Sequence, residues 1–265
     1  MNSTQLPLIT VPLGRQAHTQ AKKLASQAMQ LATGADKHQV GKRVYLNTLA
    51  VYAVDSYLRW QAYEPDFSQS DSADPILCSR WDVADLMIPG IGKLECRPIW
   101  EGETVFALPF EVIEDRIGYL AVQFGEHLDS AKLLGFAPAV DASNPPTTLP
   151  VANLQTLDYL IDYVYRLEVA NEFLQSDDLV AAKVREVMAN HQISEITAQL
   201  ERIWRIEIDS ERPYAIKDIF TGTFPTVAAE REWTADDEAD IVLLELAENL
   251  IEKLSEIWST DLTSN

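Results

Sequence analysis

The stretch DVADLMIPGIGKLECRPIWEGETVFALPFEVIEDRIGYLAVQFGEHLDSAKLLGFAPAV, residues 82–140, decides the fold, because it consists of short apolar runs separated by turn residues. Residues 92–100 alternate between an apolar set and a charged set, which are Leu94, Cys96 and Trp100 against Lys93, Glu95 and Arg97. A period of two is typical of a strand, and this one predicts one buried face and one solvated face.

The rest of this stretch predicts about four more strands. Residues 83–88 precede the turn sequence Pro89-Gly90-Ile91-Gly92, which favours a hairpin with residues 92–100. Pro109 lacks a backbone donor, so the strand that contains it lies at a sheet edge or ends there. The further runs are residues 104–112, 117–124 and 131–137. Their short connections predict a roughly five-stranded antiparallel meander.

Two helices are predicted before the sheet, after an extended segment over residues 1–14. The first begins at Arg15, carries alanines at spacings of three and four, and stops at Gly34. Asp36 is a suitable cap for the second, which runs to about Tyr63. The centre of this second helix, residues 44–60, is apolar on nearly every side, so we expect it to pack on the apolar face of the sheet. Its tyrosines favour a core role over a binding platform, and residues 64–74 indicate a surface loop.

The chain after the sheet changes character. We predict a domain over residues 1–140, a proline-rich linker over 141–155 and an acidic helical region over 156–265. Apolar spacing predicts helices near 157–167, 176–188 with Ser176 as cap, and from Ser194 onward, whereas residues 205–233 fit no single element. The clearest helix is 234–258, with a candidate interaction seam at coiled-coil spacing: Leu243, Ala247, Leu250, Leu254 and Ile257.

Charge restricts the partners more than any motif does. The chain has 265 residues with 41 acidic and 21 basic side chains, a net charge of −20. Residues 1–140 carry 12 Lys/Arg and 16 Asp/Glu, a net of −4, and residues 141–265 carry 9 and 25, a net of −16. Such a field repels nucleic acid and anionic membranes from the acidic half, and it allows a basic protein surface. Solubility alone would also explain it.

Cysteine usage and hydropathy predict a cytoplasmic protein. Cys78 and Cys96 form no disulfide framework, so we expect reduced thiols. The chain shows neither a basic-then-apolar leader nor an apolar window of membrane-spanning length, which predicts no membrane insertion.

Several runs in this order resemble family 1822 of the domains of unknown function, which is found in cyanobacteria. They are residues 44–54, 92–98, 115–123 and 131–136, and the resemblance covers about residues 6–170. It implies a cytosolic protein with a regulatory association, and it supplies no catalytic residues.

The candidates for chemistry are few. His18, His38, His127 and His191 are far apart in sequence, which favours surface histidines over a metal site. The sequence Gly90-Ile91-Gly92-Lys93 lacks the spacing of a phosphate loop and favours a hairpin turn. The carboxylate pairs are Asp82/Asp85, Glu101/Glu103 and Glu114/Asp115. Two such groups can perform acid–base chemistry when their pKa values differ, although chance pairs are common among 41 acids.

We therefore predict an α+β protein with no catalytic, cofactor or metal residues. The leading hypothesis is a non-enzymatic interaction, regulatory or adaptor protein that binds a protein partner, or a second copy, through its acidic helical part. One alternative is an enzyme with a carboxylate site that also holds Cys78, Arg80 and His127 in one pocket. Another is a small-ligand binding module that uses the aromatic helix and the sheet.

Overall fold

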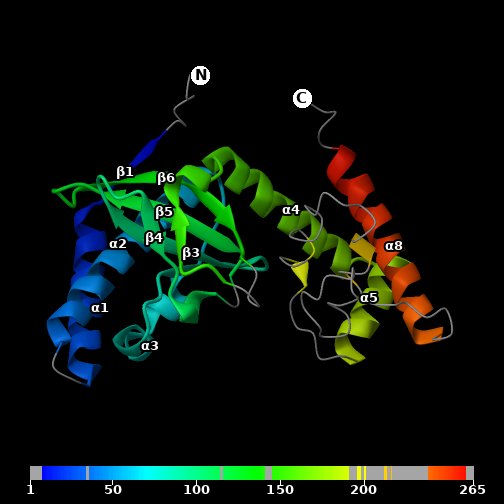
Figure 1. Ribbon diagram of the computed structural model, residues 1–265, viewed down its shortest axis with the longest axis horizontal. Helices are drawn as coiled ribbons and strands as arrows, with labels where there is room; N and C mark the ends of the chain where they lie inside the picture. Colours follow the sequence, from blue (N-terminus) through cyan, green and yellow to red (C-terminus); the bar gives the residue numbers. More distant parts are fainter. Residues whose placement is uncertain are drawn as a thin grey trace. The chain divides into compact units, whose positions relative to one another are not determined.

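The computed structural model describes residues 8–33, 36–113, 116–140, 145–190, 196–197, 200, 212–213, 216 and 238–260. The chain divides into two compact units, residues 1–161 and 162–265. Figure 1 shows a mixed sheet with helices in the first unit and helices in the second. Among the described residues, no helix is both long enough and apolar enough to cross a membrane.

A five-stranded sheet is the centre of the first unit, with the strand order β1-β6-β5-β3-β2. Its strands are β1 (Ile9–Pro12), β2 (Asp85–Ile88), β3 (Gly92–Trp100), β5 (Gly118–Phe124) and β6 (Ser130–Pro138). The predicted hairpin is present, because β2 and β3 are antiparallel neighbours joined by the glycine turn. The extended start of the chain becomes an edge strand, since β1 pairs with β6.

The sheet is mixed, so the prediction of an antiparallel meander was wrong. Strands β3 and β5 run parallel, with Leu94 opposite Gly118. Parallel neighbours need a long crossover, and residues 101–117 provide it by leaving the sheet. Within that segment β4 (Val105–Ala107) pairs instead with β7 (Thr148–Pro150) in a separate two-stranded sheet.

The predicted strand over residues 104–112 is therefore shorter than expected. It ends at Ala107, and Phe110–Val112 forms a 3-10 turn after Pro109. The partner strand β7 lies within the segment predicted as a linker, and Gln155 forms a bridge with Phe136 of β6. Residues 148–155 thus pack on the first unit.

The charged face of β3 is not solvated, which corrects a second expectation. Glu95 is 0% exposed and Arg97 is 5% exposed, whereas Trp100 on the apolar set is 45% exposed. Alternation places side chains on opposite faces but does not say what covers each face. Here Asp71 pairs with Lys93, Asp82 pairs with Arg97, and the Ala84 N–H donates to Glu95.

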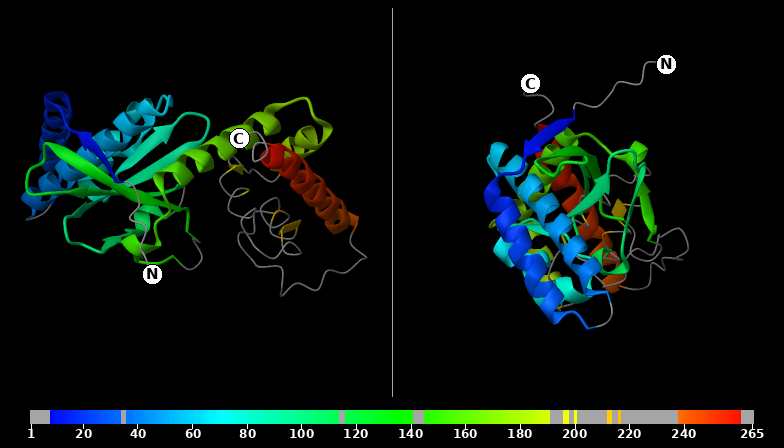
Figure 2. Two further views of the ribbon diagram at one scale, coloured as in Figure 1. Left: turned by 90° about the horizontal axis from the view of Figure 1, so that it is seen from above. Right: turned by 90° about the vertical axis from the view of Figure 1, so that its left-hand side faces the viewer.

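Both predicted helices are present, and the second packs on the sheet as expected. Helix α1 (Arg15–Leu31) buries its alanine stripe, and α2 (Lys37–Trp60) begins after Asp36, whose side chain accepts a hydrogen bond from the Gln39 N–H at 3.2 Å. Helices α1 and α2 lie side by side (Figure 2). Helix α2 also contacts four strands of the sheet, namely β1, β2, β3 and β6.

The tyrosines of α2 have structural partners. Tyr57 is buried, the Tyr45 hydroxyl lies 2.7 Å from Nδ1 of half-buried His18, and the Tyr52 ring packs on Phe67 at 5.7 Å. The predicted core role is therefore confirmed for Tyr57. His18, which was predicted to be a surface histidine, is half-buried and contacts Tyr45.

The second unit contains the end of α4 (Leu157–Gln175), α5 (Leu179–Asn190) and α8 (Glu238–Thr260). Asp178, rather than Ser176, caps α5, because its carboxylate accepts the Val180 N–H at 2.8 Å. Most of the segment from Ser194 to residue 237 lies outside the described residues. Ile196 and Leu200 are described, and both are buried in the core of this unit.

Candidate functional site

The residues proposed for an enzyme pocket do not share one environment. Cys78 is buried, and burial raises the pKa of its thiol to about 12, which leaves it protonated and unreactive at neutral pH. Arg80 is exposed at the end of α3 (Pro75–Arg80), and His127 is exposed in the turn between β5 and β6. The arginine beside Cys78 is Arg43 of α2, which donates to the Cys78 carbonyl at 2.8 Å.

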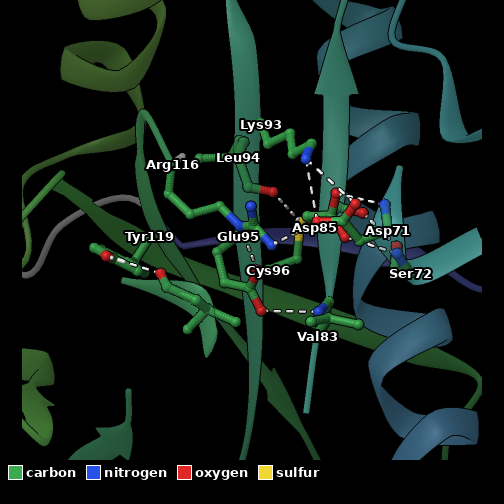
Figure 3. Close-up of polar contacts among 12 residues, drawn as sticks. Asp71, Ser72, Val83, Asp85, Lys93, Leu94, Glu95, Cys96, Arg116 and Tyr119 are labelled. Atoms are coloured by element: carbon green, nitrogen blue, oxygen red, sulfur yellow. Dashed lines mark hydrogen bonds and ion pairs between the residues drawn. The ribbon is translucent and has the colours of Figure 1, made fainter. Parts of the chain in front are cut away.

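Glu95 is the centre of a buried ion network on β3. Its Oε2 accepts from Nε of Arg116 at 3.0 Å, and its Oε1 accepts from Nη1 of Arg97 at 3.2 Å. The same Oε1 also accepts the Ala84 N–H at 2.8 Å. Figure 3 shows Arg116 reaching across to Glu95 beside Asp85, the residue opposite Glu95 in the β2–β3 register. Two guanidinium groups therefore hold one carboxylate inside the protein.

Asp82 extends the network towards α2. Its Oδ2 lies 2.9 Å from Nη2 of Arg97, and its Oδ1 accepts from Nδ2 of Asn47 at 2.8 Å. Asn47 also donates to the Val83 carbonyl. These bonds join a helix, a loop and a strand at one place.

Asp71 and Asp85 fasten the preceding loop to the sheet. Asp85 accepts the N–H groups of Asp71 at 2.9 Å and Ser72 at 2.7 Å, and the Ser72 hydroxyl donates to the Asp85 carbonyl. Asp71 in turn pairs with Lys93 at 3.1 Å and Arg116 at 3.2 Å (Figure 3). The segment predicted as a surface loop thus places buried Ser72 against β2.

The electrostatics of the network are those of paired internal charges. Burial acts to lower the pKa of Arg116, but Glu95, Asp85 and Asp71 outweigh it and raise that pKa above its ordinary value. Burial acts to raise the pKa of Asp82, but Arg97 and Asn47 outweigh it and the pKa is lowered. Burial raises the pKa of Glu95, and the two arginines offset part of that rise.

This arrangement is suited to holding the fold together rather than to catalysis. Four carboxylates face four cations, which are Asp71, Asp82, Asp85 and Glu95 with Arg43, Lys93, Arg97 and Arg116. Glu95 is fully buried and already accepts three donors, so a substrate cannot reach it. Removing one member of such a network leaves an unpaired buried charge, which is strongly destabilising.

The other candidates have structural roles as well. Glu101 pairs with Lys132 at 3.3 Å, and Glu103 accepts the Trp100 N–H at 2.7 Å. Glu114 and Asp115 lie outside the described residues. In the glycine turn, Gly90 has φ 76° and Gly92 has φ 137°, conformations that favour glycine. Among the described residues, no three His, Cys, Asp or Glu side chains form a group that could hold a metal ion.

The predicted interaction seam on α8 faces inward. Ala247, Leu250 and Leu254 are buried in a core with α4 and α5, and Ile257 packs against that core. The side chain of Leu243 lies outside the described part of the chain. Pairing of this seam with a second copy stays a prediction. The exposed side of the helix carries Glu245, Glu248 and Glu252 instead.

Sequence reasoning identified Asp82 and Asp85 only as one acidic pair among several. It missed that Asn47, Asp71, Glu95 and Arg116 converge on the same place. The signal in the sequence was weak, because it consisted of Lys93, Glu95 and Arg97 in a strand whose other residues are mostly apolar.

Comparison with models of known protein families finds a match. A family model described as a protein of unknown function (DUF1822) matches residues 12–212. No curated protein and no solved structure matches the chain.

Proposed function

This chain belongs to the DUF1822 family of proteins of unknown function, so we propose a function from the charged residues on its surface. We propose that it is a non-enzymatic interaction protein of the cytoplasm, whose acidic helical unit binds a basic surface on a protein partner. The two free, buried cysteines, Cys78 and Cys96, support a reducing compartment.

The observation that carries the proposal is the exposed acidic stripe of α8, defined as Glu245, Glu248 and Glu252. Residues three and four apart lie on the same side of a helix, so these carboxylates are neighbours. None of them forms an ion pair with another described residue. Like charges at this spacing cost about 0.2–0.5 kcal/mol per pair, and such a cost is recovered when a basic partner binds.

The opposite face of α8 explains why the stripe is held in place. Leu246, Ala247, Leu250 and Leu254 are buried among apolar residues of α4 and α5. The helix therefore cannot rotate its charges away from solvent without exposing its core face. A fixed row of carboxylates loses less conformational entropy on binding than a mobile one.

The charge of the whole unit acts in the same direction. Residues 162–265 carry 9 Lys/Arg and 23 Asp/Glu, a net charge of −14. A field of one sign accelerates association with a partner of the opposite sign and opposes wrong partners. The enzyme alternative has less support, because the carboxylates that converge are internal and already paired.

The test is affinity purification of the tagged full chain from its native cells, followed by mass spectrometry. It compares the unaltered chain with Glu245→Gln/Glu248→Gln/Glu252→Gln. The control, Glu64→Gln/Glu126→Gln/Asp129→Asn, removes the same charge from exposed positions of the first unit. We expect a partner with a basic surface that is lost with the α8 variant alone.

Two results would contradict the proposal. One is that no protein is enriched over an untagged sample, and the other is that both triple variants retain the same partner. Circular dichroism on each variant separates lost binding from lost folding.

A further inference from the structure

The hairpin of α1 and α2 is basic in a strongly acidic protein. Residues 15–60 carry seven Lys/Arg and two Asp/Glu, a net charge of +5, whereas the whole chain carries −20. Residues 1–140 as a whole nevertheless carry a net charge of −4, because the acidic residues elsewhere in that segment outnumber the basic residues of the hairpin.

An open groove of about 580 Å³ runs between these two helices. Its floor consists of Ala25, Met29 and Gly41, and its edges carry Lys22, Lys37 and Lys42. Both walls follow helical spacing. Lys22, Ser26 and Met29 lie on one side of α1, while Lys37, Gly41 and Tyr45 lie on one side of α2. Among the described residues that line the groove, none is acidic.

The lysines of the groove differ from every other lysine of the described chain except Lys23, which is also exposed and forms no ion pair with a described residue. Lys93, Lys132, Lys183 and Lys253 each pair with a carboxylate. Within the same described residues Lys22, Lys37 and Lys42 pair with none, although all three are exposed. In a protein with twice as many acids as bases, unpaired lysines gathered around one groove are available for an external anion.

We infer that the groove between α1 and α2 is a docking site for an acidic amphipathic helix of a protein partner. The apolar side of that helix would lie over Ala25, Met29 and Gly41, and its carboxylates would meet Lys22, Lys37 and Lys42. This surface is separate from the acidic stripe of α8, so the inference goes beyond the proposed function.

The floor of the groove is suited to a helix. The small side chain of Ala25 keeps this part of the floor low, so a third helix can approach closely. Met29 is flexible and fills irregular gaps, which is why methionine is common where helices dock into grooves. An added Cβ at Gly41 would lie 2.3 Å from Sδ of Met29, so Gly41 leaves room for the present position of Met29.

Charge complementarity decides the kind of helix. Three unpaired cations at the edges of an apolar floor would repel a basic amphipathic helix and attract an acidic one. The positive end of the α2 dipole, at Lys37 and His38, acts in the same sense.

The experiment selects from a displayed library of random 16-residue peptides on the full chain. We expect enriched peptides to combine Asp or Glu with apolar residues at positions i, i+3, i+4 and i+7. One enriched peptide, labelled with a fluorophore, is then titrated against variants by anisotropy. Lys22→Glu and Lys42→Glu should each weaken its binding about five- to tenfold.

The matched control is Lys23→Glu, the same charge reversal at an exposed neighbour that does not line the groove. It should leave the affinity within about twofold, because surface charges outside a contact are largely screened. Gly41→Leu, which fills the floor without changing charge, should also weaken binding. A far-ultraviolet spectrum that keeps its helical signal shows that these variants are folded.

The inference is overturned if the enriched peptides are basic or unpatterned, or if Lys23→Glu weakens binding as much as Lys22→Glu. Binding confined to anionic lipid vesicles, or to a second copy of the chain, would overturn it too. The α8 triple variant should bind the peptide normally, so failure here is separate from failure of the proposed function.

Discussion

The buried ion network and the α1–α2 groove both contain basic residues, but these residues have different roles in the two places. In the network, Arg97 and Arg116 lie inside the protein, and each contacts more than one carboxylate. In the groove, Lys22 and Lys42 are exposed and form no ion pair with a described residue. A cation that is buried and paired stabilises the fold, whereas an exposed and unpaired one contributes to the surface potential. The comparison predicts large stability effects in the first region and small ones in the second.

The largest effect is expected from Glu95→Gln. This change leaves Arg97 and Arg116 without their shared buried carboxylate, so the free energy of unfolding should fall by about 3–5 kcal/mol. Urea denaturation followed by circular dichroism measures it. The control, Glu101→Gln, removes the exposed pair with Lys132 and should cost no more than about 1 kcal/mol. If both variants lost the same free energy of unfolding, the buried network would contribute no more to stability than an exposed ion pair does.

A smaller loss is expected from Asp82→Asn, because Arg97 keeps its contact with Glu95. We expect about 1.5–3 kcal/mol at neutral pH, the range for a hydrogen bond to a charged group. The pKa of Asp82 is lowered in the folded protein by Arg97 and Asn47, which outweigh burial. The unfolded chain therefore takes up this proton at a higher pH than the folded chain does, and stability is lost as the pH falls below the ordinary value of 3.8.

The asparagine variant should lose that part of the acid sensitivity. Denaturation midpoints between pH 7 and pH 3 measure the difference, with Glu103→Gln as a control outside the network. If the two chains showed parallel pH profiles, Asp82 would not be a paired charge in solution.

The next effect has the opposite sign. Lys37 begins α2, which has no acidic residue in its first turn, and a cation there opposes the helix dipole. Lys37→Glu should raise the free energy of unfolding by about 0.3–1 kcal/mol while it weakens binding of the acidic peptide. Thermal denaturation and anisotropy on one preparation test both. A variant that is less stable than the unaltered chain would show that Lys37 has a structural role.

The smallest effect is expected from Lys22→Glu and Lys42→Glu. Each should leave the free energy of unfolding within about 0.5 kcal/mol of the unaltered chain, as exposed substitutions usually do. Urea denaturation measures this, with Lys93→Glu, which breaks a pair with Asp71, as the sensitive comparison. If either variant lost substantially more free energy of unfolding than this, the substituted lysine would have a structural role.

The success of the sequence predictions followed the range of the interactions. Asp36, three residues before its Gln39 partner, capped the helix as predicted, and the glycine turn joined β2 to β3. Local predictions failed where a distant segment intervened. Neither the parallel pairing of β3 with β5 nor the burial of Glu95 follows from spacing, since both depend on what residues 101–117 and 71–85 do elsewhere.

The candidate sites divide in the same way. The acidic stripe of α8 could be predicted, because its three glutamates share a helix face at a spacing that is visible in the sequence. The basic groove was recoverable in part, since a count over residues 15–60 shows the reversed charge. The ion network was not, because its members extend from Asn47 to Arg116 and only folding brings them together.

The amino-acid sequence by itself determined the two long helices, the β2–β3 hairpin, the acidic second unit and the family to which the chain belongs. Those properties arise from caps, turns, periodicity and composition, all of which act within a few residues or sum over many. Only the tertiary structure decided the strand order, the direction of β5 and which charged residues are paired inside the protein. The reason is physical: a charge is stable in a protein interior only beside an opposite charge, and the chain can supply that charge from any distance along its length.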